Sequence, residues 1–101
     1  ASDRVRMQRT YSLNRDKLKP ALALLSEFVD TIKDHPVNLM AAVPVLSENM
    51  SSLTVVYGFQ DLHTFGEMVD TIGTSEAFQE MLVKASDLGT LQKARVITAI
   101  D

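Results

Sequence analysis

Hydrophobic and polar residues alternate in two stretches of the chain, residues 5–13 and 53–59. The apolar positions are Val5, Met7, Tyr11 and Leu13 in the first stretch, and Leu53, Val55, Tyr57 and Phe59 in the second. A period of two residues is typical of a β-strand that has one apolar face. We therefore predict a strand in each stretch, with its apolar side chains packed against helices.

Helical spacing follows each of these strands. Between residues 17 and 34 the apolar stripe is Leu18, Leu22, Leu25, Val29 and Ile32, widened by Ala21, Leu24 and Phe28. After Asp61, a candidate cap, the stripe is Leu62, Phe65, Val69 and Ile72, with Met68 beside it. Gly73-Thr74 interrupts this second pattern, Ser75 or Thr74 can cap its continuation, and Gly89 ends it. Two amphipathic helices are predicted, the second one broken.

Two further strands complete the order. Residues 39–46 are apolar without alternation, which is typical of a strand buried on both faces, and Pro44 predicts a bulge or an edge there. Residues 47–51 form a turn in this interpretation, and residues 93–100 form the last strand. The order β-α-β-β-α-β predicts an α+β, ferredoxin-like fold with a four-stranded antiparallel sheet and helices on one face. At 101 residues, the chain is expected to form a single domain, 1–101.

The sheet face that the helices leave open is predicted to be partly apolar. Met40, Leu46, Val56 and Ile97 fall on it, beside basic residues such as Arg6 and Arg95. An apolar patch of this kind usually marks an interface. Because twofold homodimers are the commonest oligomers, we expect a homodimer formed through this open face.

At this point the chain resembles the dimeric α+β barrel superfamily. The resemblance rests on the strand order, on the strand at 53–59 that runs directly into Gln60-Asp61-Leu62, and on the helix interrupted at Gly73-Thr74. Branches of that superfamily include antibiotic-biosynthesis monooxygenases and NIPSNAP-like proteins. The resemblance implies two sheets closed into one barrel, and it implies chemistries that range from cofactor-free oxygenation to none. The haem-degrading branch uses a Trp, a His and an Asn, and this chain has no Trp.

The amino-acid composition excludes several classes of functional site. The chain contains no cysteine, which excludes thiol chemistry and thiolate metal ligands. Its two histidines have no metal-binding spacing, so we expect neither a metal nor a cofactor. No apolar run is long enough to span a membrane, and the expected location is cytoplasmic. Residues 1–19 carry a net charge of +4 and residues 20–101 a net charge of −7, so we expect no nucleic-acid partner.

Arg9 breaks the pattern of its own strand. It falls on the apolar, helix-facing side, where an unpaired buried charge is costly. It could form an ion pair with Glu27, Asp30 or another acid on a helix, or lie at an edge and extend to water. Alternatively, it could bind the carboxylate of a ligand held in an otherwise apolar cleft.

His63 and the two tyrosines also allow two interpretations each. His63 is either a surface residue in the first helical turn or an acid or base that points between helix and sheet beside Tyr57. Tyr57 and Tyr11 are either core aromatics or residues that orient a phenolic or carbonyl substrate.

Three functions follow from these candidates. The first is binding of a small apolar or carboxylate-bearing ligand, such as a fatty acid, in a cleft between sheet and helices. Its ligand-binding residues would be Arg9, Met7, Tyr11, Phe28, Tyr57, Phe59 and Met68. The second is a cofactor-independent monooxygenase acting on an aromatic or polyketide-like substrate, with His63 and Tyr57 as catalytic residues. The third is a structural or regulatory dimer without a ligand. The sequence does not decide whether the protein is an enzyme.

Overall fold

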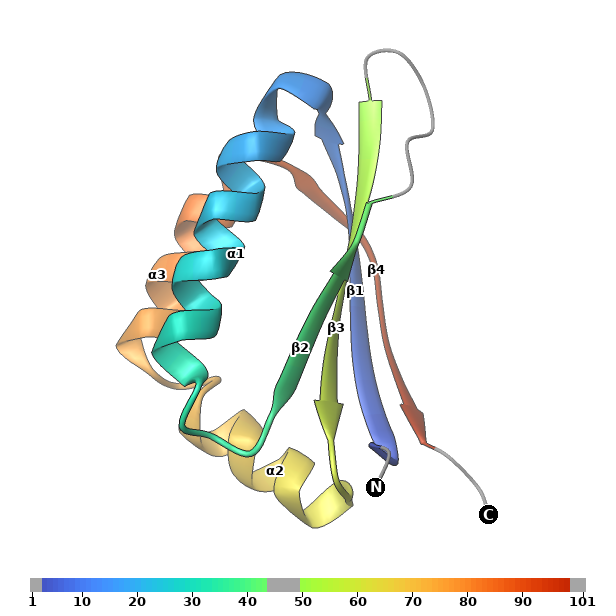
Figure 1. Cartoon of the computed structure of the whole chain (residues 1–101), viewed down its shortest axis with the longest axis vertical. Helices are drawn as coiled ribbons and strands as arrows, with labels where there is room; N and C mark the ends of the chain where they lie inside the picture. The colour runs from blue at the N-terminus through green and yellow to red at the C-terminus, as the bar shows by residue number, and fades with distance from the viewer. Residues whose placement is uncertain (1–2, 44–49, 99–101) are drawn as a thin grey trace.

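The fold is one antiparallel sheet with helices on one side, seen in a computed structural model that describes residues 3–43 and 50–98. The elements in chain order are β1 (Val5–Asn14), the short 3₁₀ turn η1 (Arg15–Lys17), α1 (Leu18–Ile32), β2 (Asn38–Ala42), β3 (Met50–Phe59), α2 (Leu62–Thr71), α3 (Glu76–Ser86) and β4 (Thr90–Thr98). The strand order in the sheet is β2-β3-β1-β4. Helices α1 and α3 run along one side of the sheet and α2 lies near one end (Figure 1). The predicted ferredoxin-like arrangement is confirmed.

The register of the central strands decides which side chains meet the helices. Met7 lies opposite Tyr57, Arg9 opposite Val55, and Tyr11 opposite Leu53. Since side chains alternate between the two faces of a sheet, all six of these residues share one face. That face is the one covered by the helices, because Val55 and Tyr57 belong to the buried core. Arg9 therefore lies on the helix-covered face, as its position in the sequence pattern predicts.

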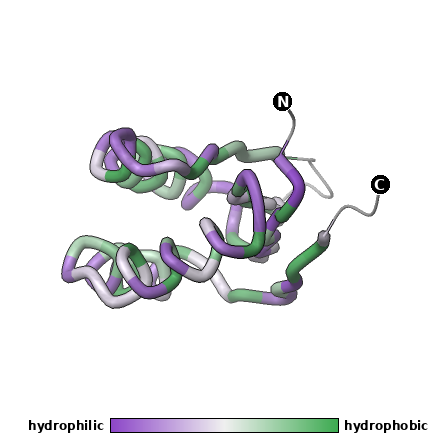
Figure 2. Tube along the Cα trace, turned by 90° about the horizontal axis from the view of Figure 1, so that it is seen from below, coloured by the Kyte–Doolittle hydropathy of each residue, from purple (hydrophilic) through white to green (hydrophobic). Residues whose placement is uncertain are grey.

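The buried core lies between the two central strands and the helices. Its members are Val5, Leu13, Leu53, Val55, Tyr57 and Phe59 from the strands, and Phe28, Ile32, Met68 and Met81 from the helices. Seen from below, α1 and α3 appear as two rods side by side on the same side of the sheet (Figure 2). The interior is thus bounded by the sheet, by the antiparallel helices α1 and α3, and by α2 at one end (Figure 1).

Side-chain caps define the second helical segment. The Asp61 carboxylate accepts a hydrogen bond from the Thr64 backbone N–H at 2.8 Å and begins α2. After the break, the Ser75 hydroxyl accepts one from the Phe78 N–H at 3.2 Å and begins α3. These contacts satisfy N–H groups that have no partner within a helix. The predicted break at Gly73-Thr74 is confirmed, with Asp61 and Ser75 as the caps.

In both α1 and α2, the residues that pack against the sheet differ from the predicted apolar stripe. In α1 the buried residues are Phe28 and Ile32, whereas Leu22 and Val29 remain 39% and 40% exposed. In α2 the buried residue is Met68, and Leu62 is 62% exposed. A helix with more apolar residues than one packed face can hold has to leave some in solvent, and the sheet selects which ones.

The strand boundaries also differ from the prediction in three places. Met50 and Ser51, which were expected in a turn, belong to β3 because they continue its ladder with Asn14 and Leu13. Strand β4 begins at Thr90 rather than at 93, directly after the predicted stop at Gly89. Strand β2 is largely exposed rather than buried on both faces, because it is an edge strand. The expected bulge or edge at Pro44 and the open-face position of Leu46 lie outside the described residues.

The second face of the sheet carries no helix in the described part of the chain (Figure 1). Gln8 lies opposite Val56 and Arg95, and Met40 lies opposite Val56. This face includes Met40 at 65% exposure and Ile97 at 40% exposure. Arg95 donates from its Nε to the Gln8 Oε1 at 3.3 Å. The expected positions of Met40, Val56, Arg95 and Ile97 on the open face are thus confirmed.

Candidate functional site

A cavity of about 180 Å³ lies between the sheet and the second helical segment. Five of the seven residues that the sequence suggested for ligand binding line it: Met7, Arg9, Tyr57, Phe59 and Met68. Strands β1 and β3 supply the sheet side, and α2 with the link to α3 supplies the opposite side. We refer to this space as the Arg9 cavity. It is the cleft between sheet and helices that the sequence pattern suggested.

Six further residues that line the Arg9 cavity were not anticipated from the sequence. They are Ile32, Val37, Val69, Ile72, Gly73 and Phe78. The break at Gly73-Thr74 was the available signal, because it brings the end of α2 and the start of α3 to the same place. Apolar residues at such a break are not distinguished from ordinary core residues by their spacing alone.

Among the residues that the structure describes, Arg9 is the one cation that lines this cavity. Its Nε is buried and has no hydrogen-bond partner among the described residues. No ion pair joins Arg9 to Glu27 or Asp30 in that part of the chain, and Asp30 lies instead 3.8 Å from the Lys33 Nζ. The ion-pair interpretation of Arg9 with those two acids is therefore wrong. Buried donors are nearly always hydrogen-bonded, so an unpartnered guanidinium N–H beside a cavity is an available donor for an anionic group.

Tyr57 stands beside Arg9 and is 5% exposed. Burial raises the pKa of its hydroxyl well above the ordinary value for tyrosine, the nearby Tyr11 raises it further, and Arg9 opposes the shift. Because even an ordinary tyrosine has a pKa of about 10, Tyr57 is a neutral phenol at neutral pH. A neutral phenol can donate one hydrogen bond and also accept one.

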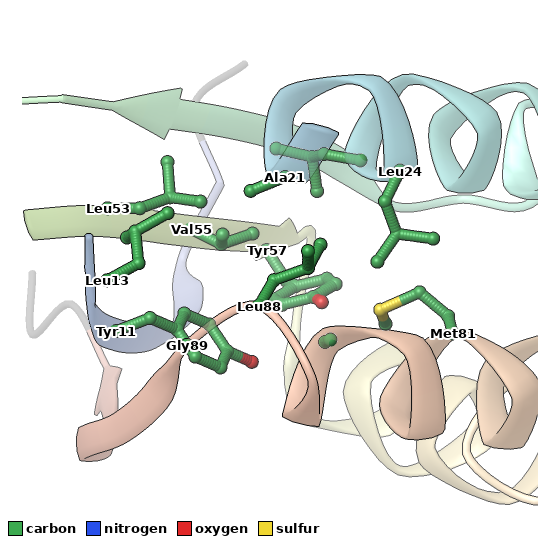
Figure 3. A pocket seen from close by; sticks show the side chains of 12 residues that line it. Tyr11, Leu13, Ala21, Leu24, Leu53, Val55, Tyr57, Met81, Leu88 and Gly89 are labelled. Atoms are coloured by element: carbon green, nitrogen blue, oxygen red, sulfur yellow. The ribbon is translucent and has the colours of Figure 1, made fainter. Parts of the chain in front are cut away.

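Tyr11 does not line the Arg9 cavity. It lines a second, smaller cavity of about 50 Å³ under α1 and α3, together with Tyr57 and aliphatic side chains such as Leu24, Leu53 and Leu88. Figure 3 shows the side chains of Tyr11 and Tyr57 extending from neighbouring strands into this space, with Leu24 and Met81 across from them. We refer to it as the Tyr11 cavity. Tyr57 is shared by both spaces.

Phe28 lines neither the Arg9 cavity nor the Tyr11 cavity. It is 3% exposed, and its ring packs against that of Phe78 with centroids 5.7 Å apart. Because Phe78 lines the Arg9 cavity, Phe28 supports the wall from behind. This packing does not favour the predicted role of Phe28 as a residue that contacts the ligand directly.

His63 lies outside both cavities. Its side chain is 84% exposed, and its Nε2 is 2.6 Å from the Glu67 Oε1 one turn along α2. Of the two interpretations of His63, the structure agrees with the surface residue in the first helical turn and not with the acid or base beside Tyr57, because α2 buries Met68 and turns His63 outward. The structure brings Tyr57 to the cavity and leaves His63 on the surface.

Two further observations concern the described residues as a set. Within residues 3–43 and 50–98, no three His, Asp or Glu side chains gather where they could hold a metal ion. No helix in those same ranges is long and apolar enough to cross a membrane.

Comparison with known proteins shows similarity of structure without similarity of sequence. No protein-family model matches the chain, and no curated protein matches it. A NIPSNAP family protein from Agrobacterium tumefaciens superposes with a TM-score of 0.72 at 17% identity, covering 100% of this chain and 90% of that one. A variant of SnoaB, a cofactor-independent oxygenase from Streptomyces nogalater, superposes with a TM-score of 0.70 at 13% identity, covering 99% of this chain and 96% of that one.

A third similar structure is a Chloroflexus aurantiacus protein assigned to the antibiotic biosynthesis monooxygenases, with a TM-score of 0.64 at 9% identity and coverage of 96% and 93%. The resemblance to the dimeric α+β barrel superfamily is thereby confirmed as a resemblance of fold. At these identities the likeness concerns the fold alone, because one fold hosts many unrelated functions.

Proposed function

We propose that the protein binds a small apolar ligand bearing a carboxylate in the Arg9 cavity. The observation that carries this proposal is the buried Arg9 Nε without a hydrogen-bond partner in the described part of the chain. The residues around it are almost entirely apolar, namely Met7, Phe59 and Met68 with others of that kind. Ligand pockets typically combine apolar walls with a few polar groups that fix the orientation of the ligand.

The residues that line the Arg9 cavity indicate how the ligand would bind. The ligand carboxylate accepts a hydrogen bond from the Arg9 guanidinium and so gives the Nε a partner that it does not have among the described residues. The apolar part of the ligand lies against Met7, Phe59 and Met68. Methionine side chains are flexible and polarisable, so they adapt to alkyl groups of different shape.

Isothermal titration calorimetry with octanoate and octanol tests this function. Wild-type protein is expected to bind octanoate more tightly than octanol. Replacing Arg9 by Met removes a charged hydrogen bond worth about 1.5–3 kcal/mol, which is about a 10- to 100-fold loss of octanoate affinity. Octanol binding should change little. Equal octanoate affinity in wild type and Arg9→Met would reject the proposal.

The matched control is Arg6→Met. Arg6 lies three residues earlier on β1, is exposed, and alternates to the opposite face of the sheet. The Arg6→Met substitution removes the same charge and introduces the same side chain as Arg9→Met, without changing the lining of the Arg9 cavity. Octanoate affinity in Arg6→Met should equal that of the wild type, which separates a local role of Arg9 from a general effect of net charge.

A homodimer formed through the open sheet face is the second part of the proposal. The exposed apolar side chains of Met40 and Ile97 support it, as does the fold shared with dimeric α+β barrel proteins. A dimer would bury these side chains and would leave the helix-covered cavities on its outside. A dimer that binds no ligand, structural or regulatory, is what remains if the calorimetry shows no binding.

Cofactor-independent oxygenase activity is a second candidate function, favoured by the fold shared with SnoaB. In this chain Tyr57 would orient a phenolic or carbonyl substrate, because its side chain lines both cavities. His63, the base suggested by the sequence, is on the surface. Oxygen uptake with anthrone-like substrates tests this candidate. Uptake that Tyr57→Phe abolishes and His63→Ala leaves unchanged would support it, and no uptake would reject it.

A further inference from the structure

The Arg9 cavity and the Tyr11 cavity continue one another along the same three elements. Along β1 the lining residue Arg9 is followed by Tyr11, and along β3 Tyr57 is followed toward the other end by Val55. Along α3, Phe78 lines the first cavity and Met81 the second, one turn further. The two spaces therefore lie in succession between the sheet and the helices.

Tyr57 separates the two spaces. Among the described residues it is the one that lines both cavities. Figure 3 shows its ring reaching into the Tyr11 cavity from β3, with Leu88 and Met81 nearby. The shared boundary of the two cavities is thus one side chain and not the backbone of a strand or a helix.

We propose that the two cavities form one binding channel with Tyr57 at their junction, and that this channel takes a medium-chain carboxylic acid. This inference rests on the proposed function, because it places the carboxylate at Arg9. The end of the alkyl chain passes the Tyr57 ring and enters the Tyr11 cavity. Tyr57 is then the residue that determines which chain lengths are accepted.

The volumes set the length of the acid. An engineered apolar cavity of about 150 Å³ in another protein holds one benzene ring, which gives a scale of about 25 Å³ per carbon. By that scale the Arg9 cavity of about 180 Å³ holds about seven carbons. The Tyr11 cavity of about 50 Å³ holds about two more. The channel thus holds about nine carbons, which accommodates octanoate, leaves about one carbon of decanoate outside, and is too short for a long-chain fatty acid.

The lining supports an alkyl tail rather than a second polar group. Leu24, Leu53 and Leu88 are aliphatic, and the polar atoms nearby are the hydroxyls of Tyr11 and Tyr57. An alkyl chain that leaves water for this surface gains about fourfold in affinity for each buried CH₂, equivalent to about 0.8 kcal/mol. The affinity of a series of acids therefore measures how far the channel extends.

The test is calorimetry with hexanoate, octanoate, decanoate and dodecanoate on wild type and on Ala21→Leu. Ala21 lines the Tyr11 cavity from α1, and a leucine there fills it. Wild-type affinity should rise from hexanoate to decanoate and stop rising at dodecanoate. In Ala21→Leu, hexanoate should bind as in wild type, and decanoate should bind about 16-fold more weakly, the loss of two buried CH₂ groups at about fourfold each.

Ala23→Leu is the matched control, because Ala23 is exposed on the outer side of the same helix and should leave the whole series unchanged. If Ala21→Leu does not fold, Leu88→Phe fills the same cavity from the link between α3 and β4. If Ala21→Leu and Leu88→Phe leave the affinities of all four acids unchanged while Arg9→Met still weakens the binding of every acid, the channel is overturned and the proposed function stands. If none of the acids binds the wild-type protein, both the channel and the proposed function are overturned.

Discussion

Arg9 and Tyr57 lie diagonally across β1 and β3 on the helix-covered face of the sheet, and both line the same cavity. Met7 is the direct cross-strand partner of Tyr57, and Val55 is that of Arg9. Arg9 acts on Tyr57 electrostatically, because it lowers a pKa that burial raises. A half-buried cation whose Nε has no hydrogen-bond partner among the described residues and a buried phenol that stays neutral thus line one apolar cavity.

Arg9→Met is expected to stabilise the ligand-free protein. A buried donor without a hydrogen-bond partner costs about 1–3 kcal/mol, and methionine fills similar space without that donor. The free energy of unfolding measured with urea should rise by this amount. The same substitution weakens octanoate binding, so stability and function would move in opposite directions. A less stable Arg9→Met protein would show that the guanidinium contributes to folding in a way that the proposed site does not include.

Tyr57 should make the protein sensitive to alkaline pH. Burial raises the pKa of its hydroxyl in the folded state above the ordinary value of about 10 that it has in the unfolded chain. Above that pH the unfolded state loses a proton that the folded state keeps, so the free energy of unfolding falls with rising pH. The slope from this one residue is about 1.4 kcal/mol per pH unit.

Tyr57→Phe should remove this contribution. Urea unfolding of wild type and variant at several pH values above 10 gives the difference between the two slopes, in which the other titrating groups cancel. Parallel pH profiles would contradict the burial-driven shift.

Two glycines of the second helical segment are expected to respond oppositely to alanine. A Cβ at Gly73 would collide with the Val69 backbone carbonyl oxygen, whereas a Cβ at Gly66 would meet nothing within 4 Å. Gly73→Ala should therefore lower the free energy of unfolding by about 1–3 kcal/mol, because backbone has to shift. Gly66→Ala should raise it by about 0.8–1 kcal/mol, the difference in helix propensity. Similar effects at the two sites would contradict the described link between α2 and α3.

A charge at the centre of the open sheet face should separate the proposed dimer. Val56 is half-buried on the central strand β3, and its cross-strand neighbours are Gln8 and Met40. Val56→Glu would bury an unpaired carboxylate in a dimer interface, which is strongly unfavourable. Analytical ultracentrifugation should show a dimer for wild type and a monomer for Val56→Glu. Val83→Glu on α3, where the valine is 67% exposed, is the control that should remain dimeric. A monomeric wild-type protein would reject the interface.

The order of the elements could be predicted from the sequence because local chemistry determines it. Alternation marks β1 and β3, and Asp61 and Ser75 cap helices through hydrogen bonds that span three residues. The break at Gly73-Thr74 was visible for the same reason. Arg9 could be singled out because a charged residue on an apolar strand face interrupts a simple period of two.

The orientation of the helices could not be predicted, so the sequence left open whether His63 faces the cleft or the solvent. Periodicity tells which residues of a helix share a face, and it does not tell which face the sheet covers when the apolar stripe is broad. In α2 the sheet side holds Met68, so Leu62 and His63 face solvent. The division of the interior into two cavities at Tyr57 likewise depends on side-chain packing between elements distant in the sequence.

NMR observation of the arginine Nε–H groups during octanoate titration tests the central claim most directly. The Arg9 signal is assigned by its loss in Arg9→Met. The proposed function predicts that this signal shifts and saturates with octanoate, does not shift with octanol, and that the Arg6 signal stays unchanged in both titrations. An Arg9 Nε–H signal that remains fixed while octanoate shifts other signals of the protein would contradict the assignment of Arg9 as the carboxylate anchor.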